Sequence, residues 1–67
     1  MTPIKGKTAT GKEFEAVIRT IGNEHDWLVE FPKAHAESHG LFDTPELAEA
    51  ALRTFLEDIG AVIEEEG

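Results

Sequence analysis

The sequence contains no cysteine, which excludes disulfide bonds and cysteine-ligated zinc. A chain of 67 residues is small, and a protein of this size buries only about 60% of the surface that its unfolded form exposes. Its fold must therefore be stabilised by a hydrophobic core, by a metal ion bound without cysteine, or by a partner.

Long apolar segments are also lacking. The apolar runs are too short to cross a bilayer, and the N-terminal residues have no apolar stretch of the kind found in signal peptides. We therefore expect a cytoplasmic protein that does not enter a membrane. Hydrophobic residues make up 40% of the chain and charged residues 30%, which is typical of a folded protein. At this length we expect a single small domain over residues 1–67.

Positive charge is scarce. Six lysines and arginines stand against fourteen aspartates and glutamates, which gives a formal net charge of −8. Residues 1–23 carry +2 and residues 24–67 carry −10. Such a field repels phosphate backbones and attracts basic proteins, so we expect a basic protein partner and no direct contact with nucleic acid. The alternative interpretation is that the charge serves only solubility.

The first half of the chain predicts three antiparallel strands, separated by glycine-containing turns at Gly11 and at Gly22–Asp26. The strands are expected at Thr2–Thr10, Glu13–Ile21 and Trp27–Phe31. Pro32 should end the third strand, residues 33–40 are expected to form a loop, and Leu41-Phe42 can add a short strand. Alternation places Phe14, Ala16 and Ile18 on one face of the second strand, and Trp27, Val29 and Phe31 on one face of the third.

The clearest local signal is a helix that begins after Thr44, with Pro45 at its first position and Gly60 just beyond its end. The apolar stripe of this helix consists of Ala48, Leu52, Phe55, Leu56 and Ile59. The stripe should cover the sheet face that carries Trp27. Residues 61–63 predict a short last strand. The expected fold is α+β, a three-stranded antiparallel meander packed on one C-terminal helix, in the order β-β-β-α-β.

A second apolar pattern, formed by Val17, Ile21 and Leu28, alternates out of phase with the main face. An apolar patch on the second face of the sheet would favour a homodimer or another partner. The alternative is that residues 33–40 or the chain ends fold over it.

Catalytic motifs are missing. The chain has no glycine-rich phosphate loop, no G-x-S-x-G, no nucleophilic cysteine and a single serine, Ser38. We therefore expect no enzymatic activity and no cofactor.

The histidines offer the only candidate metal ligands of note. His35, Glu37 and His39 are spaced so that an extended segment directs all three to one side, and His25 can join them from the preceding turn. H-x3-H alone is a weak motif, and loop histidines are usually solvated. We expect no metal and keep a histidine-based metal-binding module as an alternative.

The acidic residues supply the preferred candidate site. Five carboxylates from the third strand, the loop and the start of the helix are predicted to converge near the helix N-terminus and to bind the partner: Glu30, Glu37, Asp43, Glu46 and Glu49.

Residues 27–51 carry a family resemblance. The segments WLVEFP and GLFDTPELAEAA resemble the N-terminal domain of HicB-type antitoxins, in which a strand ending in F-P is followed by a loop, G-D-T and an amphipathic helix. Phe31-Pro32, Asp43-Thr44 and Ala48 match that pattern, whereas Leu41 and Phe42 are inserted between its glycine and aspartate. The resemblance implies a β-β-β-α-β fold and neutralisation of a small basic RNA-binding toxin. The family's C-terminal DNA-binding segment has no counterpart here, so operator binding is not implied.

The sequence thus predicts a small, acidic, non-enzymatic binding protein that acts on a basic protein, in the manner of an antitoxin or inhibitor. Three alternatives stay open: a DNA-mimic or phage-type inhibitor, a structural or assembly homodimer, and the histidine-based metal module.

Overall fold

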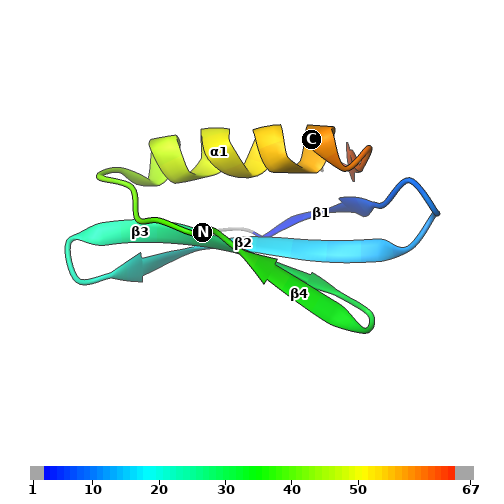
Figure 1. Cartoon of the computed structure of the whole chain (residues 1–67), viewed down its shortest axis with the longest axis horizontal. Coiled ribbons are helices and arrows are strands. Elements are labelled where there is room, and N and C mark those ends of the chain that lie inside the picture. The colour runs from blue at the N-terminus through cyan, green and yellow to red at the C-terminus, as the bar shows by residue number, and fades with distance from the viewer. Residues whose placement is uncertain (1–2, 65–67) are drawn as a thin grey trace.

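The chain folds as one antiparallel sheet with a helix across one face, in a computed structural model that describes residues 3–64 (Figure 1). The elements are β1 (Ile4–Lys7), β2 (Glu13–Ile21), β3 (Glu24–Phe31), β4 (Ala34–Glu37), α1 (Pro45–Asp58) and β5 (Val62–Glu64). The five strands lie in the order β4-β3-β2-β1-β5. The predicted α+β class is confirmed. Within the described residues no helix has the length and apolar character needed to cross a membrane.

Strand β4 is the main departure from the predicted elements. The expected loop over residues 33–40 is wrong at 34–37, which pair with β3 so that Ala36 lies opposite Val29. Pro32 does end β3 as predicted, and with Lys33 it forms the turn that brings the chain back. The order is therefore β-β-β-β-α-β.

Tight turns account for the other shifts at strand ends. β1 stops at Lys7, well before Thr10, because the Thr8 carbonyl accepts a hydrogen bond from the Gly11 N–H (2.9 Å) and the chain turns there. The predicted start of β1 at Thr2 lies outside the described residues. β3 begins at Glu24, earlier than predicted, because only two residues form the turn, with Gly22 at a φ of +64°.

The predicted short strand at Leu41-Phe42 is reduced to one isolated bridge. Phe42 and His25 exchange backbone hydrogen bonds of 2.8 and 2.7 Å, and no longer strand forms around Phe42. This bridge brings residues 41–44, and hence the start of α1, to the end of the sheet where β3 begins.

The helix ends match the prediction. The Thr44 hydroxyl accepts a hydrogen bond from the Leu47 N–H at 3.2 Å, which satisfies one of the free N–H groups of the first turn. At the other end Gly60 has a φ of +76°, and the Ala61 N–H donates to the Leu56 carbonyl at 2.9 Å. This is the glycine-dependent stop that the sequence indicated.

The core lies between α1 and the sheet. Its buried apolar residues are Phe14, Ala16, Trp27, Val29, Ala48, Leu52 and Leu56. The predicted inner faces of β2 and β3 are therefore confirmed, and the Trp27 and Phe55 rings lie 4.7 Å apart. Ile59, expected in the helix stripe, is 39% exposed because it caps the helix instead of continuing it.

Gly6 makes a close approach of strands possible. It is buried on the inner face, opposite Phe14 on β2 and Ile63 on β5. A Cβ atom there would overlap the Val62 carbonyl oxygen and lie 2.8 Å from the Phe14 ring. Strand β1 can sit between its two neighbours because this position has no side chain.

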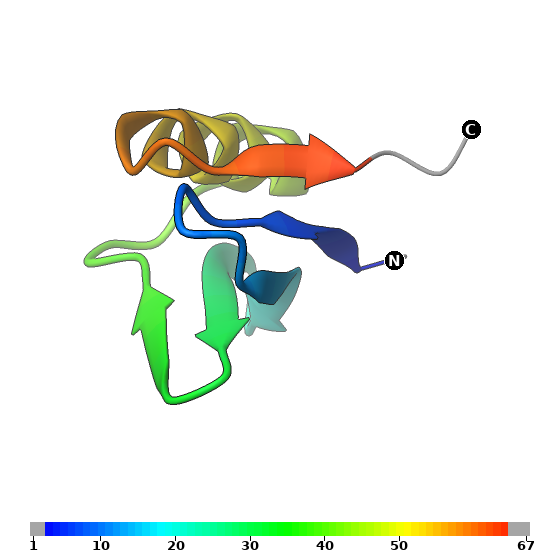
Figure 2. The same ribbon diagram turned by 90° about the vertical axis from the view of Figure 1, so that its right-hand side faces the viewer.

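Viewed from one end, the sheet curls away from the helix (Figure 2). α1 and β5 lie together on one side of the molecule, and the β3–β4 hairpin projects on the other. One face of the sheet is thus packed against α1 and the other is turned away from it. We call the second face the open face.

Candidate functional site

The open face is defined by strand register, since side chains alternate between the two faces. Two residues share a face when they are paired across strands or lie two positions apart along one strand. The face that carries the buried residues is the inner one. The side chains of the open face belong to Lys5, Lys7, Glu13, Glu15, Val17, Arg19, Ile21, Glu24, Asp26, Leu28, Glu30, His35, Glu37, Val62 and Glu64.

Apolar side chains occupy the centre of this face, as the out-of-phase pattern predicted. Val17 and Leu28 are directly opposed and half-buried, whereas Ile21, which is 49% exposed, lies beyond Arg19 at the end of β2. Residues 33–40 do not fold over them, because 34–37 extend the sheet sideways as β4. The second predicted cover, the chain ends, lies partly outside the described residues. The patch is small and is bordered by charges on both sides.

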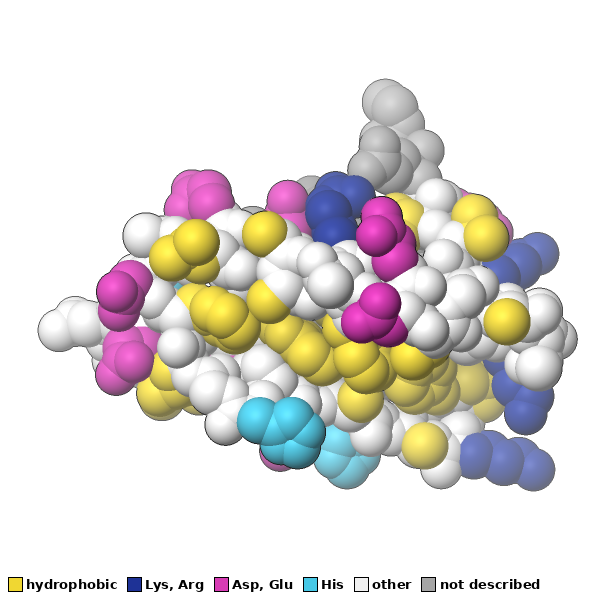
Figure 3. All heavy atoms as spheres, turned by 45° about the horizontal axis from the view of Figure 1, so that its top comes forward, with side chains coloured by type: hydrophobic (Ala, Val, Ile, Leu, Met, Phe, Trp, Pro, Cys, Tyr) yellow, Lys and Arg dark blue, Asp and Glu magenta, His cyan; other side chains and the backbone are white. Residues whose placement is uncertain are grey.

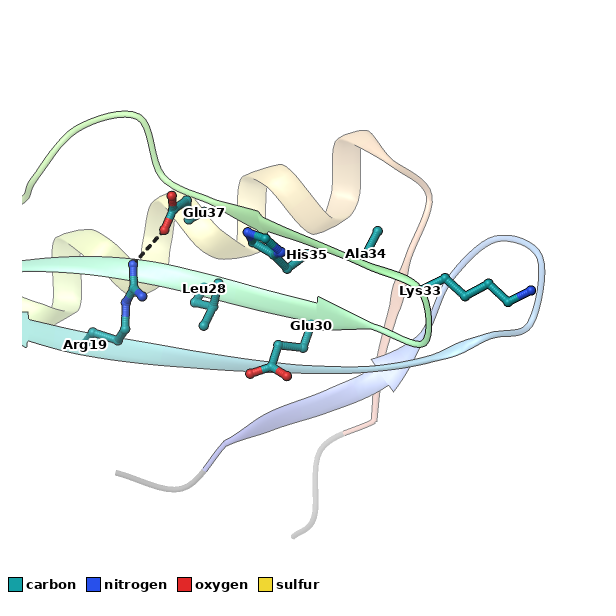
Figure 4. A pocket seen from close by; sticks show the side chains of 7 residues that line it. All are labelled: Arg19, Leu28, Glu30, Lys33, Ala34, His35 and Glu37. Carbon is teal, nitrogen blue, oxygen red and sulfur yellow. Dashed lines mark hydrogen bonds and ion pairs between the residues drawn. The ribbon is translucent and has the colours of Figure 1, made fainter.

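On one side of the apolar centre, Arg19 is held by two carboxylates. Its Nε and Nη2 atoms donate to both carboxylate oxygens of Asp26 (2.9 and 2.5 Å). Nη2 also donates to Glu37 at 2.9 Å, a contact drawn in Figure 4. The bond to Asp26, and then that to Glu37, raises the pKa of the guanidinium above its ordinary value. Arg19 covers Asp26, which is only 5% exposed although it lies on the open face.

On the other side, two glutamates meet. Glu15 and Glu30 are directly opposite one another on β2 and β3, so their Cβ atoms are about 5 Å apart. Within residues 3–64 neither forms an ion pair. Lys5 is the residue opposite Glu15 on β1, and Glu64 is opposite Lys5 on β5, but no ion pair joins Lys5 to either carboxylate within residues 3–64. Like charges in this position destabilise a sheet.

A shallow hollow of about 490 Å³ on the open face extends from Arg19 to Glu30 (Figure 4). Its lining combines carboxylates and cations with an apolar floor, and comprises Arg19, Leu28, Glu30, Lys33, Ala34, His35 and Glu37. Because Arg19 is turned to Asp26 and Glu37, its charge is already matched. The Glu30 carboxylate stays available at the rim.

The five carboxylates predicted to converge lie on two different surfaces. Glu30 and Glu37 are on the open face, whereas Asp43, Glu46 and Glu49 belong to the helix layer on the other side of the sheet. The prediction of a single cluster near the helix N-terminus is therefore wrong. Alternation along β3 places Glu30 on the open face, and pairing of β4 with β3 places Glu37 on the same face. Glu49 is also engaged by Arg53 at 3.5 Å.

The histidines of the described residues do not form a metal-binding cluster. His35 and Glu37 share the open face of β4, and His39 follows the strand. All three border a hollow beside Trp27 and Phe55. His25 is turned to the inner face, where its Nδ1 lies 3.2 Å from the Thr20 hydroxyl. Over residues 3–64 no group of three potential ligand side chains is placed to hold a metal ion.

The reasoning from sequence missed Glu15, Asp26 and Arg19 as parts of the site. The signal that locates them is the turn at Gly22-Asn23: a two-residue turn fixes Ile21 opposite Glu24, and every further pair follows from it. A longer turn, as predicted, leaves the register undetermined.

Comparison with protein-family models, curated proteins and solved structures finds no match to this chain.

Proposed function

We propose that this is a small, non-enzymatic binding protein of the cytoplasm whose open face receives a basic protein. The observation that carries the proposal is the direct opposition of Glu15 and Glu30, without an ion pair to either within the described part of the chain. A lysine or arginine from a partner, placed between the two carboxylates, would turn an unfavourable contact into a favourable one.

The surroundings of the pair support the same partner. Val17 and Leu28 supply a small apolar contact beside the carboxylates. Protein interfaces commonly combine an apolar centre with a polar rim in this way. Arg19 does not compete for Glu30, because Asp26 and Glu37 hold it. The net charge of −8 would in addition accelerate the encounter with a basic protein.

The resemblance of residues 27–51 to HicB-type antitoxins makes a small basic RNA-binding toxin the first partner to test. This choice rests on the sequence motifs alone. The proposal for the open face holds for any basic protein that can place a lysine or arginine between the two glutamates.

The test is capture of proteins from a native host lysate on the immobilised chain, with identification by mass spectrometry. Three double variants are compared with the wild type, each removing two negative charges: Glu15→Gln with Glu30→Gln on the open face, Glu46→Gln with Glu49→Gln at the helix start, and Glu57→Gln with Asp58→Asn at the helix end.

We expect a basic protein to be retained by the wild type and by both helix variants and lost by the open-face variant. Loss with the Glu46 and Glu49 variant instead would move the site to the helix. Equal capture by all four proteins would contradict an electrostatic site of any kind.

A further inference from the structure

Strand β4 has one edge that none of the described strands pairs with. It is the first strand in the sheet order, and among the described elements it packs against β3 alone, whereas α1 covers β3, β2 and β5. The hairpin that carries it projects from the body of the molecule (Figure 2). An uncovered edge presents backbone donors and acceptors that can pair with another strand.

Which backbone groups are free follows from the ladder. The Ser38 N–H donates to the Trp27 carbonyl at 3.0 Å, so these two residues form a hydrogen-bonded pair. Such pairs alternate along antiparallel strands, and Ala34 and Ala36 are therefore also bonded to β3. The N–H and C=O groups of His35, and those of Glu37, point to the open edge.

We propose that a second copy of this chain pairs with β4 in antiparallel orientation, about a two-fold axis at Ala36. Backbone hydrogen bonds form only if residues whose N–H and C=O groups point to the open edge lie opposite one another. The two-fold axis can then lie at His35, Ala36 or Glu37. An axis at Glu37 opposes two carboxylates and one at His35 opposes two imidazoles. An axis at Ala36 places His35 opposite Glu37 of the second copy, twice by symmetry, so that an imidazole N–H can donate to a carboxylate that also accepts from Arg19.

The side chains at the axis fit this register. The two Ala36 residues would form a non-hydrogen-bonded pair, in which Cα atoms approach to about 4.5 Å, and alanine is small enough for that contact. Ala36 also borders a hollow of about 330 Å³ lined with Trp27 and Phe55. Figure 3 shows apolar side chains in a strip beneath the helix, with histidines along its lower border. Edge pairing would join this strip to that of the second copy.

The dimer should be weak. Four residues on each side make a short contact, and two chains of −8 repel each other at long range. Added salt should therefore strengthen association by screening that repulsion. This pairing uses the edge of β4 and does not depend on the proposed role of the open face.

Single cysteines give a matched test, because the chain has none of its own. In the proposed register Ala36→Cys brings two thiols together at the axis. Ala34→Cys places them about 13 Å apart along the strands, beyond the reach of a disulfide. We expect oxidation to link Ala36→Cys into dimers at least tenfold faster than Ala34→Cys. Equal rates would overturn the register.

Sedimentation equilibrium of the unmodified chain up to millimolar concentration, in 0.15 M and 0.5 M salt, tests association itself. We expect a reversible dimer, tighter at the higher salt. His35→Pro removes an N–H that points outward and leaves the bonds to β3 intact, which circular dichroism can verify. It should weaken the dimer about tenfold. A monomer under all conditions, or a dimer that the folded His35→Pro variant forms equally well, would overturn the proposal.

Discussion

Glu15 on β2 and Glu30 on β3 are directly opposed on the open face of the sheet, and neither takes part in an ion pair within residues 3–64. The same face pairs Arg19 with Asp26 at the equivalent position four residues along each strand. In the part of the chain that the structure describes, Arg19 and Asp26 neutralise one another, whereas Glu15 and Glu30 have no ion-pair partner. A contact that opposes folding is expected where function requires it.

Replacing Glu30 with Gln should raise the free energy of unfolding by about 0.2–1 kcal/mol, because it removes the repulsion across the strands. Urea denaturation measures this. Glu46→Gln makes the same change in net charge but removes an acid from the first turn of α1, so it should lower stability by about 0.3–1 kcal/mol. Equal effects of the two variants would show that only the overall charge matters.

Arg19→Met should destabilise the fold by about 1–3 kcal/mol, because the nearly buried Asp26 carboxylate loses two hydrogen bonds. Adding Asp26→Asn removes the unpaired charge, so the double variant should be less destabilised than the sum of the two single variants. Additive losses in this double-mutant cycle would mean that the two side chains act independently.

Gly6→Ala should lower the free energy of unfolding by about 1–3 kcal/mol, since the added Cβ overlaps the Val62 carbonyl oxygen and forces β5 away from β1. Amide hydrogen exchange should become faster in β5 first. Gly40→Ala is the matched control: its Cβ meets no atom within 4 Å, and its effect should stay within about 0.5 kcal/mol. An unchanged stability of Gly6→Ala would contradict the close strand packing.

Thr44→Ala should cost about 1 kcal/mol, because it removes the acceptor of the Leu47 N–H at the start of α1. The other helix-associated threonine, Thr54, donates its hydroxyl proton to the Ala50 carbonyl at 3.1 Å within the helix. Thr54→Ala should be neutral or slightly stabilising, since alanine is the better helix former. Thermal unfolding of the two variants side by side checks the assignment, and a larger loss for Thr54→Ala would contradict it.

The helix and the inner face could be predicted from local signals. Thr44, Pro45 and Gly60 each fix a helix end by their own chemistry, and the stripe through Leu52 and Leu56 selects the buried side. Phe14 and Val29 alternate with polar residues, which marks the inner face of their strands. None of these inferences requires knowledge of which strands are neighbours.

Strand β4 and the site could not be predicted in the same way. Ala34 and Ala36 are too small to give a clear apolar alternation, so the pairing with β3 supplies what the local sequence does not. The opposition of Glu15 and Glu30 depends on register, and an error of one residue in the turn at Gly22 removes it. The acidic residues that the sequence groups into one cluster therefore lie on both sides of the sheet.

Binding of a basic protein to the open face can be followed residue by residue by chemical-shift mapping. The isotope-labelled chain would be titrated with the basic protein captured from the host lysate, and backbone amide shifts followed by residue. We expect the largest changes at Glu15, Val17, Leu28 and Glu30, and the loss of these changes in the Glu15→Gln, Glu30→Gln variant. Changes confined to the exposed side of α1, around Ala50, Thr54 and Glu57, would contradict it.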